Sequence, residues 1–403
     1  MISRELYLQR IRPFIDKDII KVLTGIRRSG KSVLLKLIAN ELMQNGVQEK
    51  QCISYNFENM RYRHLLTAEA LHDEIAKRIE EIGAKAYLFL DEIQEVKNWE
   101  LCINSLRVAY DCDIYLTGSN AKLLSGELAS YLSGRYIECV IYPFSYAEFI
   151  ALYKEYHVDT DAHQLFSTYL QLGGMPYLGN LQFVEEPCTL YLTELYHSVV
   201  LKDIVKRYGI RDIDLLERII VYVMAHVGTI FSATTISKYL KSESRNVAPE
   251  TILNYLKACE DAFLLYRVKR EDMQRKKILA SNEKFYIADH GIRQAVWGRN
   301  MRDINLVLEN IVYMELLRRG YRVTVGKVAE KEIDFIAVKQ ENKIYIQVCY
   351  LLASESTIER EFGVFKSIPD NYPKYVLSLD DFDMSRDGIV HKNIKTFLLQ
   401  DSI

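Results

Sequence analysis

The feature that most constrains this sequence is the octapeptide Gly25-Ile26-Arg27-Arg28-Ser29-Gly30-Lys31-Ser32. It matches the pattern G-x-x-x-x-G-K-[ST] of a phosphate-binding loop, with a β-type run (Ile19 to Thr24) before it and a helical pattern (Ser32 to Met43) after it. The glycines let backbone N–H groups point at phosphate oxygens, and the helix N-terminus adds a positive dipole. We therefore predict that all eight residues bind ATP, with Lys31 on the β- and γ-phosphates and Ser32 on Mg²⁺.

The first 145 residues alternate short β-type runs with helical patterns. This alternation predicts an α/β domain built on a parallel sheet. The β-type runs are Asp18 to Thr24, Cys52 to Phe57, Tyr87 to Leu90, Asp113 to Thr117 and Tyr136 to Ile141.

Carboxylates follow the third of these runs directly. A buried strand there would deliver Asp91 to Mg²⁺ at the edge of the sheet, and would place Glu92 to activate a water molecule as a general base. The fourth run ends in Thr117-Gly118-Ser119-Asn120. Ser119 is our first choice for a residue that senses the γ-phosphate or holds the water, with Thr117 and Asn120 as alternates, and a helix cap is an equally good interpretation.

Arg135 stands directly before the fifth run. An arginine in this place could reach the γ-phosphate of a neighbouring subunit and stabilise charge in the transition state. The competing interpretation is an ordinary surface arginine.

These motifs, with several further ones, resemble one family. The further motifs are Leu90 to Gln94 with Trp99, Ser133 to Tyr136, Pro143 to Phe149, Gly173 to Pro176, Asp203 to Val205 and Ala288 to Gly291. Together they resemble the prokaryotic AAA-type P-loop ATPases that carry a C-terminal domain of unknown function. The resemblance implies an AAA-like parallel-sheet ATPase module, a winged helix and an α/β restriction-endonuclease-like C-terminal fold.

Four segments follow from this interpretation. They are a P-loop ATPase core (1–145), a helical extension or lid (146–210), a winged helix (211–290) and a restriction-endonuclease-like domain (291–403). In the third segment, helical patterns at Thr234 to Leu240 and from Pro249 onward precede two β-type runs, Ala262 to Val268 and Lys284 to Ala288, which would form the wing.

The net charge of −2 gives no reason to expect a nucleic-acid partner, but it hides a local imbalance. Residues 201–300 carry 18 Lys and Arg against 12 Asp and Glu, a balance of +6, which leaves −8 for the rest of the chain. The densest cluster lies on and beside the predicted wing and comprises Arg267, Lys269, Arg270, Arg275, Lys276 and Lys277. A basic wing suits phosphate contacts in duplex DNA. The alternative is a solvated hairpin on a lid or protein-contact domain.

The restriction-endonuclease resemblance also implies a metal site in the C-terminal segment. Glu309, on the predicted helix Asp303 to Gly320, and Asp334, on a β-type run, fit its acidic positions. Gln347 stands where a second strand carboxylate belongs, and Cys349 where a lysine belongs; a neutral amide is a weaker Mg²⁺ ligand and a thiol lacks the ammonium's charge. Lys366 could substitute for the lysine. We expect a catalytically degenerate nuclease fold, with an active nuclease as the alternative.

The sequence thus predicts a Mg²⁺-dependent ATPase whose nucleotide state controls its C-terminal half. An arginine acting in trans requires a neighbour, so we expect a homo-oligomer. The competing class is a nucleotide-dependent switch or scaffold that regulates a protein partner with little turnover, and a metal-dependent nuclease is the third. Seven cysteines without a C-x-x-C pair, an N-terminus without an apolar h-region and the charged Leu215 to Phe231 stretch favour a cytoplasmic protein without a membrane segment.

Overall fold

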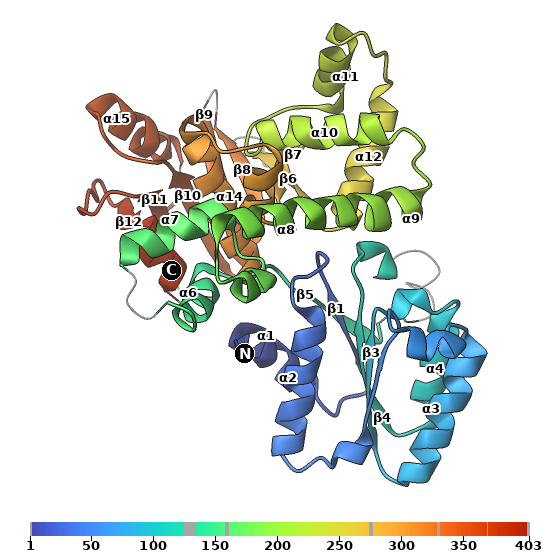
Figure 1. Cartoon of the computed structure of the whole chain (residues 1–403). Coiled ribbons are helices and arrows are strands. Elements are labelled where there is room, and N and C mark those ends of the chain that lie inside the picture. The colour runs from blue at the N-terminus through green and yellow to red at the C-terminus, as the bar shows by residue number, and fades with distance from the viewer. Residues whose placement is uncertain are drawn as a thin grey trace. The chain divides into compact units, whose positions relative to one another are not determined.

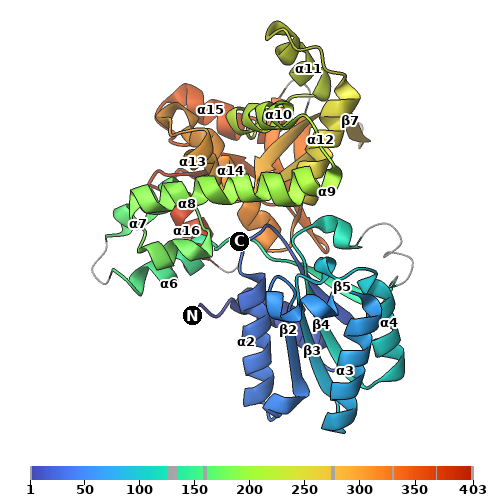
Figure 2. The ribbon, with the colours of Figure 1, turned by 45° about the vertical axis from the view of Figure 1, so that its right-hand side comes forward.

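The computed structural model of the chain describes residues 2–124, 132, 134–157, 161–273, 277–328, 331–368 and 370–400. The chain divides into two compact units, which Figures 1 and 2 show from two directions. One unit comprises Met1–Pro143 with Asp261–Phe263, and the other comprises Phe144–Glu260 with Leu264–Ile403. The main division therefore falls beside the boundary that we expected after residue 145.

The first unit is built on a five-stranded parallel sheet in the order β2-β3-β4-β1-β5, which confirms the predicted α/β fold. The strands differ from the predicted runs only at their ends and are β1 (Ile20–Thr24), β2 (Cys52–Asn56), β3 (Ala86–Asp91), β4 (Cys112–Thr117) and β5 (Tyr136–Val140). The helices are α1 (Glu5–Ile11), α2 (Lys31–Gln44), α3 (Ala68–Ile82) and α4 (Trp99–Ala109), with short 3₁₀ turns η1 (Arg12–Phe14), η2 (Glu49–Gln51), η3 (Met60–Leu65), η4 (Ile93–Glu95) and η5 (Ala121–Leu124).

Local sequence explains why these helices begin, end and pack as they do. In α3, the Thr67 hydroxyl accepts a hydrogen bond from the Ala70 N–H at the start, and Gly83 ends the helix in a left-handed conformation (φ 62°). Leu71, Ile75 and Ile79 fall on one face and are buried. In Figures 1 and 2, α2 lies on one face of the sheet and α3 and α4 lie on the other, so the sheet's strand ends remain the place where loops gather.

The second unit begins with helices and ends with a mixed sheet. Its helical elements are α6 (Tyr146–Lys154), α7 (Ala162–Leu172), η6 (Pro176–Leu181), α8 (Glu185–Ser198), η7 (Val199–Val205), α9 (Lys206–Tyr208), α10 (Ile213–Ala225), α11 (Ala233–Ser242), α12 (Pro249–Asp261), α13 (His290–Val296), η8 (Met301–Asp303), α14 (Ile304–Arg318), α15 (Glu355–Gly363), η9 (Phe365–Ser367) and α16 (Ile394–Leu399). The π-helical segment η7 joins α8 to α9, and the three form one continuous rod in Figure 1.

Seven strands form the sheet of the second unit, in the order β12-β11-β10-β9-β8-β6-β7. They are β6 (Leu265–Asp272), β7 (Lys277–Ile287), β8 (Arg322–Val328), β9 (Lys331–Lys339), β10 (Asn342–Val348), β11 (Lys374–Ser378) and β12 (Val390–Asn393). The hairpin β6–β7 is the one expected as a wing, but β6 also pairs in parallel with β8 through Arg270 and Val325. The strands on both sides of the expected boundary at residue 290 therefore belong to one sheet, and the hairpin lies at the edge of that sheet.

Two glycine-rich motifs meet in the second unit. The Gly174 N–H donates to Asp289 Oδ2 (2.7 Å), and the Phe144 N–H donates to the Gly174 carbonyl oxygen (2.7 Å). A Cβ atom on Gly291 would lie 2.0 Å from the Leu172 carbonyl oxygen. Glycine is required here because two backbone segments approach within contact distance. The motifs Gly173 to Pro176 and Ala288 to Gly291 thus have a packing role.

Candidate functional site

The phosphate loop connects β1 to α2 in the first unit. Gly25 has a φ of 133°, and a Cβ atom there would lie 2.3 Å from the Ile141 carbonyl oxygen on the segment after β5. Gly30 has a φ of 100° and stands immediately before the first residue of α2. Both glycines are therefore needed for the loop to curl back over the helix N-terminus, which is the geometry that presents N–H groups to an anion.

Lys31 is buried within this loop. Its ammonium donates hydrogen bonds to the Gly25 carbonyl oxygen (3.0 Å) and the Ile26 carbonyl oxygen (3.1 Å). Arg4, which is also buried, donates to the Ser29 carbonyl oxygen (3.0 Å) and the Tyr142 carbonyl oxygen (2.7 Å). Arg4 thus fixes the loop to the end of β5.

Two carboxylates stand at the carboxyl end of β3, as predicted from the sequence. Asp91 accepts hydrogen bonds from Thr117 Oγ1 (2.6 Å) and Asn56 Nδ2 (2.7 Å), which end the neighbouring strands β4 and β2. Burial raises the pKa of Asp91, while hydrogen bonds from Thr117 and Ser32 act against this shift. Since Ser32 also contacts Asp91, the hydroxyl and carboxylate predicted to hold Mg²⁺ lie together, and oxygen ligands of this kind suit that ion.

Glu92 is the first residue after β3, at the same edge of the sheet as Asp91. Its backbone is left-handed (φ 55°), and its N–H donates to Thr117 Oγ1 (2.8 Å). Its Oε1 is 4.0 Å from Lys31 Nζ, and its Oε2 accepts a hydrogen bond from Gln94 Nε2 (2.5 Å). The structure therefore brings Lys31, at the start of α2, together with Asp91 and Glu92 at the end of β3.

The remaining predicted residues of the first unit differ in their placement. Ser119 and Asn120 are buried directly after β4, the strand that separates β1 from β3. Arg27 is ion-paired with Glu58, next to the end of β2. Arg135 is exposed at the start of β5 and donates to Asn104 Oδ1 (3.3 Å). Because parallel strands start at one edge and end at the other, Arg135 is at the sheet edge opposite the loop of its own chain.

Sequence reasoning missed Asn56, Gln94 and Arg4. Asn56 lies one residue before the end of the predicted run Cys52 to Phe57, and ends of parallel strands meet at one sheet edge, so its position was a usable signal. Gln94 follows Glu92 by two residues, but nothing in the pattern shows that its side chain turns back. Arg4 is distant in sequence and gave no signal.

In the second unit, three of the predicted nuclease positions are neighbours. Glu309 and Asp334 are buried, and Gln347 Oε1 accepts the Asp334 backbone N–H (3.2 Å). An unpredicted residue, Lys284 of β7, lies among the carboxylates: its Nζ is 2.8 Å from Glu309 Oε1 and 3.7 Å from Asp334 Oδ1. A third carboxylate, Glu332 Oε1, is 2.8 Å from the same ammonium.

Burial and the neighbouring charges shift the pKa values of two groups in this cluster, Asp334 and Lys284. Burial raises the pKa of Asp334, and the nearby Glu309 raises it further. Burial lowers the pKa of Lys284, but Glu309, Asp334 and Glu332 outweigh this and hold it above its usual value. Lys284 is therefore a buried cation between Glu309 and Asp334, the two carboxylates predicted to hold a metal ion. Lys366 is exposed and pairs with Glu359 (3.2 Å), and Cys349 is buried.

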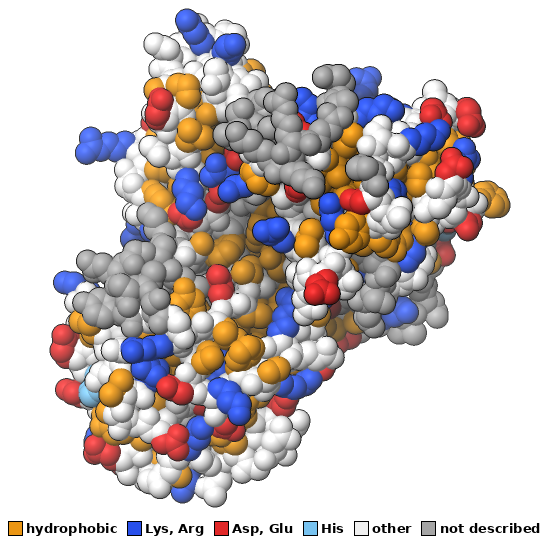
Figure 3. Space-filling view, turned by 180° about the vertical axis from the view of Figure 1, so that it is seen from behind, with side chains coloured by type: hydrophobic (Ala, Val, Ile, Leu, Met, Phe, Trp, Pro, Cys, Tyr) orange, Lys and Arg blue, Asp and Glu red, His pale blue; other side chains and the backbone are white. Residues whose placement is uncertain are grey.

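Most of the residues predicted to contact DNA either lie close to acidic side chains of the same chain or lie outside the described residues. Arg267 pairs with Glu260 (2.9 Å) and Glu283 (3.3 Å), and Arg270 lies 3.8 Å from Glu332. Lys269 is exposed. Arg275, Lys276 and the side chain of Lys277 lie outside the described residues. On the face in Figure 3, the described Lys and Arg side chains are interspersed with Asp and Glu rather than gathered in one basic stripe.

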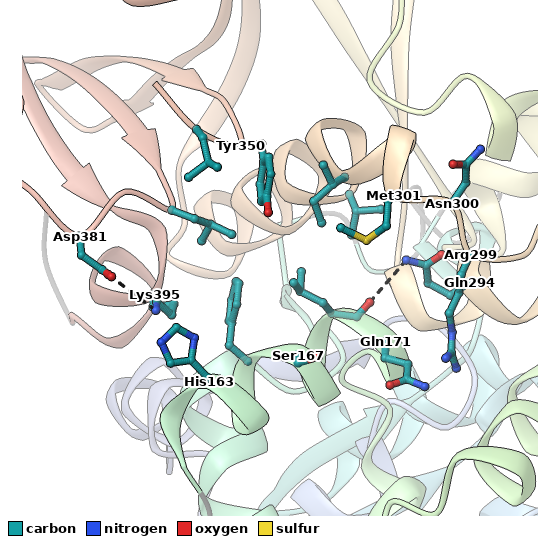
Figure 4. A pocket seen from close by; sticks show the side chains of 16 residues that line it. His163, Ser167, Gln171, Gln294, Arg299, Asn300, Met301, Tyr350, Asp381 and Lys395 are labelled. Atoms are coloured by element: carbon teal, nitrogen blue, oxygen red, sulfur yellow. Dashed lines mark hydrogen bonds and ion pairs between the residues drawn. The ribbon is translucent and has the colours of Figure 1, made fainter. Parts of the chain in front are cut away.

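A cavity of about 500 Å³ lies within the second unit. Figure 4 shows that Lys395 and Asp381 approach it from one side, and Gln294 and Arg299 from the other. Apolar residues, among them Phe166, line the space between these polar groups, and none of the lining residues was a predicted site residue.

Among the parts of the chain that the structure describes, no helix has the length and apolar character needed to cross a bilayer.

Comparisons with known proteins match two parts of the chain to family models. A family model for an AAA domain matches residues 17–150, and one for a domain of unknown function, DUF8612, matches residues 163–303. An uncharacterized protein of Haemophilus influenzae is 40% identical over 405 residues, 99% of each chain. One of Methanocaldococcus jannaschii is 31% identical over 369 residues, 87% of this chain and 79% of that protein. A Walker-type ATPase structure of Pyrococcus abyssi has a TM-score of 0.53 at 17% identity, covering 73% of this chain and 96% of that one.

The phosphate loop, the strand order and the AAA-domain match define the first unit as an AAA-type P-loop ATPase domain. The fold likeness to the Pyrococcus structure agrees with this class. At 40% identity over nearly its full length, the chain belongs to the same protein family as the Haemophilus influenzae protein.

Proposed function

We propose that this protein binds and hydrolyses ATP with Mg²⁺, and that nucleotide state controls its C-terminal half. One observation carries the proposal: the loop after β1 and the carboxylates after β3 meet, with Lys31 Nζ 4.0 Å from Glu92 Oε1 and Asp91 in contact with Ser32. A phosphate cradle, a metal-binding pair and a general base in one place are the parts that phosphoryl transfer to water requires.

Each residue then has a defined task. Lys31 exchanges the carbonyl oxygens of Gly25 and Ile26 for phosphate oxygens, and the loop N–H groups orient the phosphates. Ser32 and Asp91 would hold Mg²⁺, which neutralises charge on the phosphates when bound. Glu92 accepts a proton from the attacking water.

Two substitutions test this assignment. Lys31→Ala removes the cation at the phosphates and should abolish ATP binding in a fluorescent-nucleotide titration. Glu92→Gln keeps the size of the side chain and one acceptor oxygen but removes its basicity, so binding should persist while steady-state hydrolysis falls at least 100-fold. Unchanged hydrolysis in both variants would disprove the ATPase assignment. Binding without measurable turnover in the wild-type chain would instead favour the nucleotide-dependent switch.

The remaining roles are proposals for separate experiments. We propose that Arg135 acts on the ATP site of a neighbouring copy and Ser119 at the site of its own chain. Native mass spectrometry with and without ATP tests the assembly that Arg135 requires. Lys284 among the carboxylates supports a catalytically degenerate nuclease-like fold, and plasmid incubated with Mg²⁺ or Mn²⁺ should stay intact. For a winged helix that binds duplex DNA, Lys269 is an exposed candidate contact among the described residues, and salt-dependent fluorescence anisotropy is the test.

A further inference from the structure

We propose that Gln94 is a positioning residue for Glu92, holding one carboxylate oxygen so that the other faces the phosphates. This inference rests on the proposed ATPase function. Gln94 Nε2 donates to Glu92 Oε2 (2.5 Å), while Glu92 Oε1 is the oxygen nearest Lys31 Nζ (4.0 Å). Lys31 belongs to the loop that cradles the phosphates, so Oε1 points toward the place where an attacking water must lie. Gln94 thus decides which oxygen acts as the base.

The amide of Gln94 can take only one orientation. An ionised carboxylate accepts hydrogen bonds and donates none, so only the NH₂ end of the amide can face Glu92. The opposite end, Oε1, is buried and accepts no hydrogen bond from any residue that the structure describes. A buried acceptor without a donor destabilises the folded state. Gln94 therefore keeps its hydrogen bond to Glu92 although its own Oε1 is left without a donor among the described residues.

Packing holds Gln94 in this place. It lies on η4 between Ile93 and Val96, which are both buried. A Cβ atom on Gly118 would lie 2.9 Å from Gln94 Oε1 and 2.7 Å from Leu123 Cδ2, so the end of the Gln94 side chain lies close to the Gly118 backbone, in the motif after β4.

The backbone of Glu92 is fixed independently of Gln94. Its left-handed conformation and the hydrogen bond from its N–H to Thr117 Oγ1 (2.8 Å) set the direction of the Cα–Cβ bond. The rotation of the side chain about its own bonds is the freedom that remains, and the amide removes it. Fixing a general base in this way lowers the barrier of the chemical step without changing substrate binding.

A double-mutant cycle in the full-length chain tests the proposal. Gln94→Met keeps the length of the side chain and removes the amide, and we expect kcat to fall about 10-fold with KM for ATP unchanged. In the Glu92→Gln background, the same substitution should cause no further loss, because the base that Gln94 positions is already gone. Gln94→Glu, which faces Glu92 with a second carboxylate, should lower kcat more than Gln94→Met. Glu95→Gln, on the exposed side of the same turn, is the matched control and should leave kcat unchanged.

Other outcomes overturn the proposal. An equal loss from Gln94→Met in both backgrounds, or a change in KM alone, would mean that Gln94 acts on stability or binding and not through Glu92. Full activity of Gln94→Met and Gln94→Glu would remove any role while leaving the ATPase assignment intact. If Glu92→Gln itself hydrolyses ATP at the wild-type rate, the failure lies in the proposed function, and the role of Gln94 falls with it.

Discussion

At the scale of single residues, the Thr117 hydroxyl joins the two carboxylate positions. It donates to Asp91 Oδ1 and accepts from the Glu92 N–H, and its side chain is fully buried. Thr117→Val conserves the shape but leaves that N–H without a partner, so we expect the free energy of unfolding to fall by about 1–3 kcal/mol. Urea unfolding measures this loss, and ATP hydrolysis should fall as well, because Asp91 and Glu92 lose a shared restraint.

Thr117→Ser is the control, because serine retains the hydroxyl. It should keep most of the hydrolysis rate. If the valine variant were as stable and as active as the serine variant, the hydroxyl would have no part in organising the carboxylates.

Residues with a local motif could be predicted from the sequence, and residues that depend on neighbouring strands could not. Lys31, Asp91 and Glu92 follow from patterns of eight residues or fewer. Asn56 reaches Asp91 only because β2 and β3 pair in the register that sets these two residues side by side. The strand end could place Asn56 at this edge of the sheet, but the register that sets it opposite Asp91 is a property of the sheet and not of any spacing along the chain.

At the scale of elements, Gly173 fixes how α7 ends against the start of α13. Its φ is 75°, and a Cβ atom there would lie 2.2 Å from Asp289 Oδ1 and 2.7 Å from the Gly291 backbone nitrogen. Gly173→Ala must therefore displace the carboxylate that accepts the Gly174 N–H. We expect the free energy of unfolding of the second unit to fall by about 3 kcal/mol or more, and chemical denaturation measures this loss.

Gly209→Ala is the matched control for this prediction. Gly209 ends α9 with a φ of 62°, and a Cβ atom there meets nothing within 4 Å. Its substitution should cost only the backbone term, about 1 kcal/mol. Equal losses in the two variants would show that backbone conformation alone, and not the close approach to Asp289, explains the glycine at 173.

Element types were predictable wherever periodicity was local. The five strands of the first unit and helices such as α12 and α14 lie where apolar patterns and caps placed them. The hairpin β6–β7 was also predicted as two strands, but its partner was not. Pairing between β6 and β8 joins residues more than 50 positions apart, as Arg270 and Val325 show, and strand propensity carries no information about such partners.

At the scale of the whole molecule, each of the two units contains its own sheet, and the second sheet spans what the sequence suggested were two domains. Lys284 of β7 binds Glu309 of α14 and Glu332 of β9, so its charge ties the hairpin to the C-terminal part of the sheet and to α14. The sequence did not predict this role, because a lysine in a basic segment is usually solvated. Here it is 2% exposed, and three acidic side chains converge on it.

Substitution of Lys284 should consequently lower the free energy of unfolding of the second unit, and the loss should be larger at high pH. Lys284→Met leaves Glu309, Glu332 and Asp334 close together without the ammonium, which should cost about 3–5 kcal/mol near pH 8. The pKa of Asp334 is already raised by burial, and loss of the cation raises it further. A carboxyl whose pKa is raised on folding binds protons more tightly in the folded state, so lowering the pH toward 5 should recover part of the loss. Unfolding curves at pH 5 and 8 measure this difference.

Lys269→Met, on the exposed side of β6, is the control and should change the free energy of unfolding by less than about 0.5 kcal/mol at either pH. A loss in Lys284→Met that does not depend on pH would mean that packing of its side chain, and not its charge, holds the hairpin to the core.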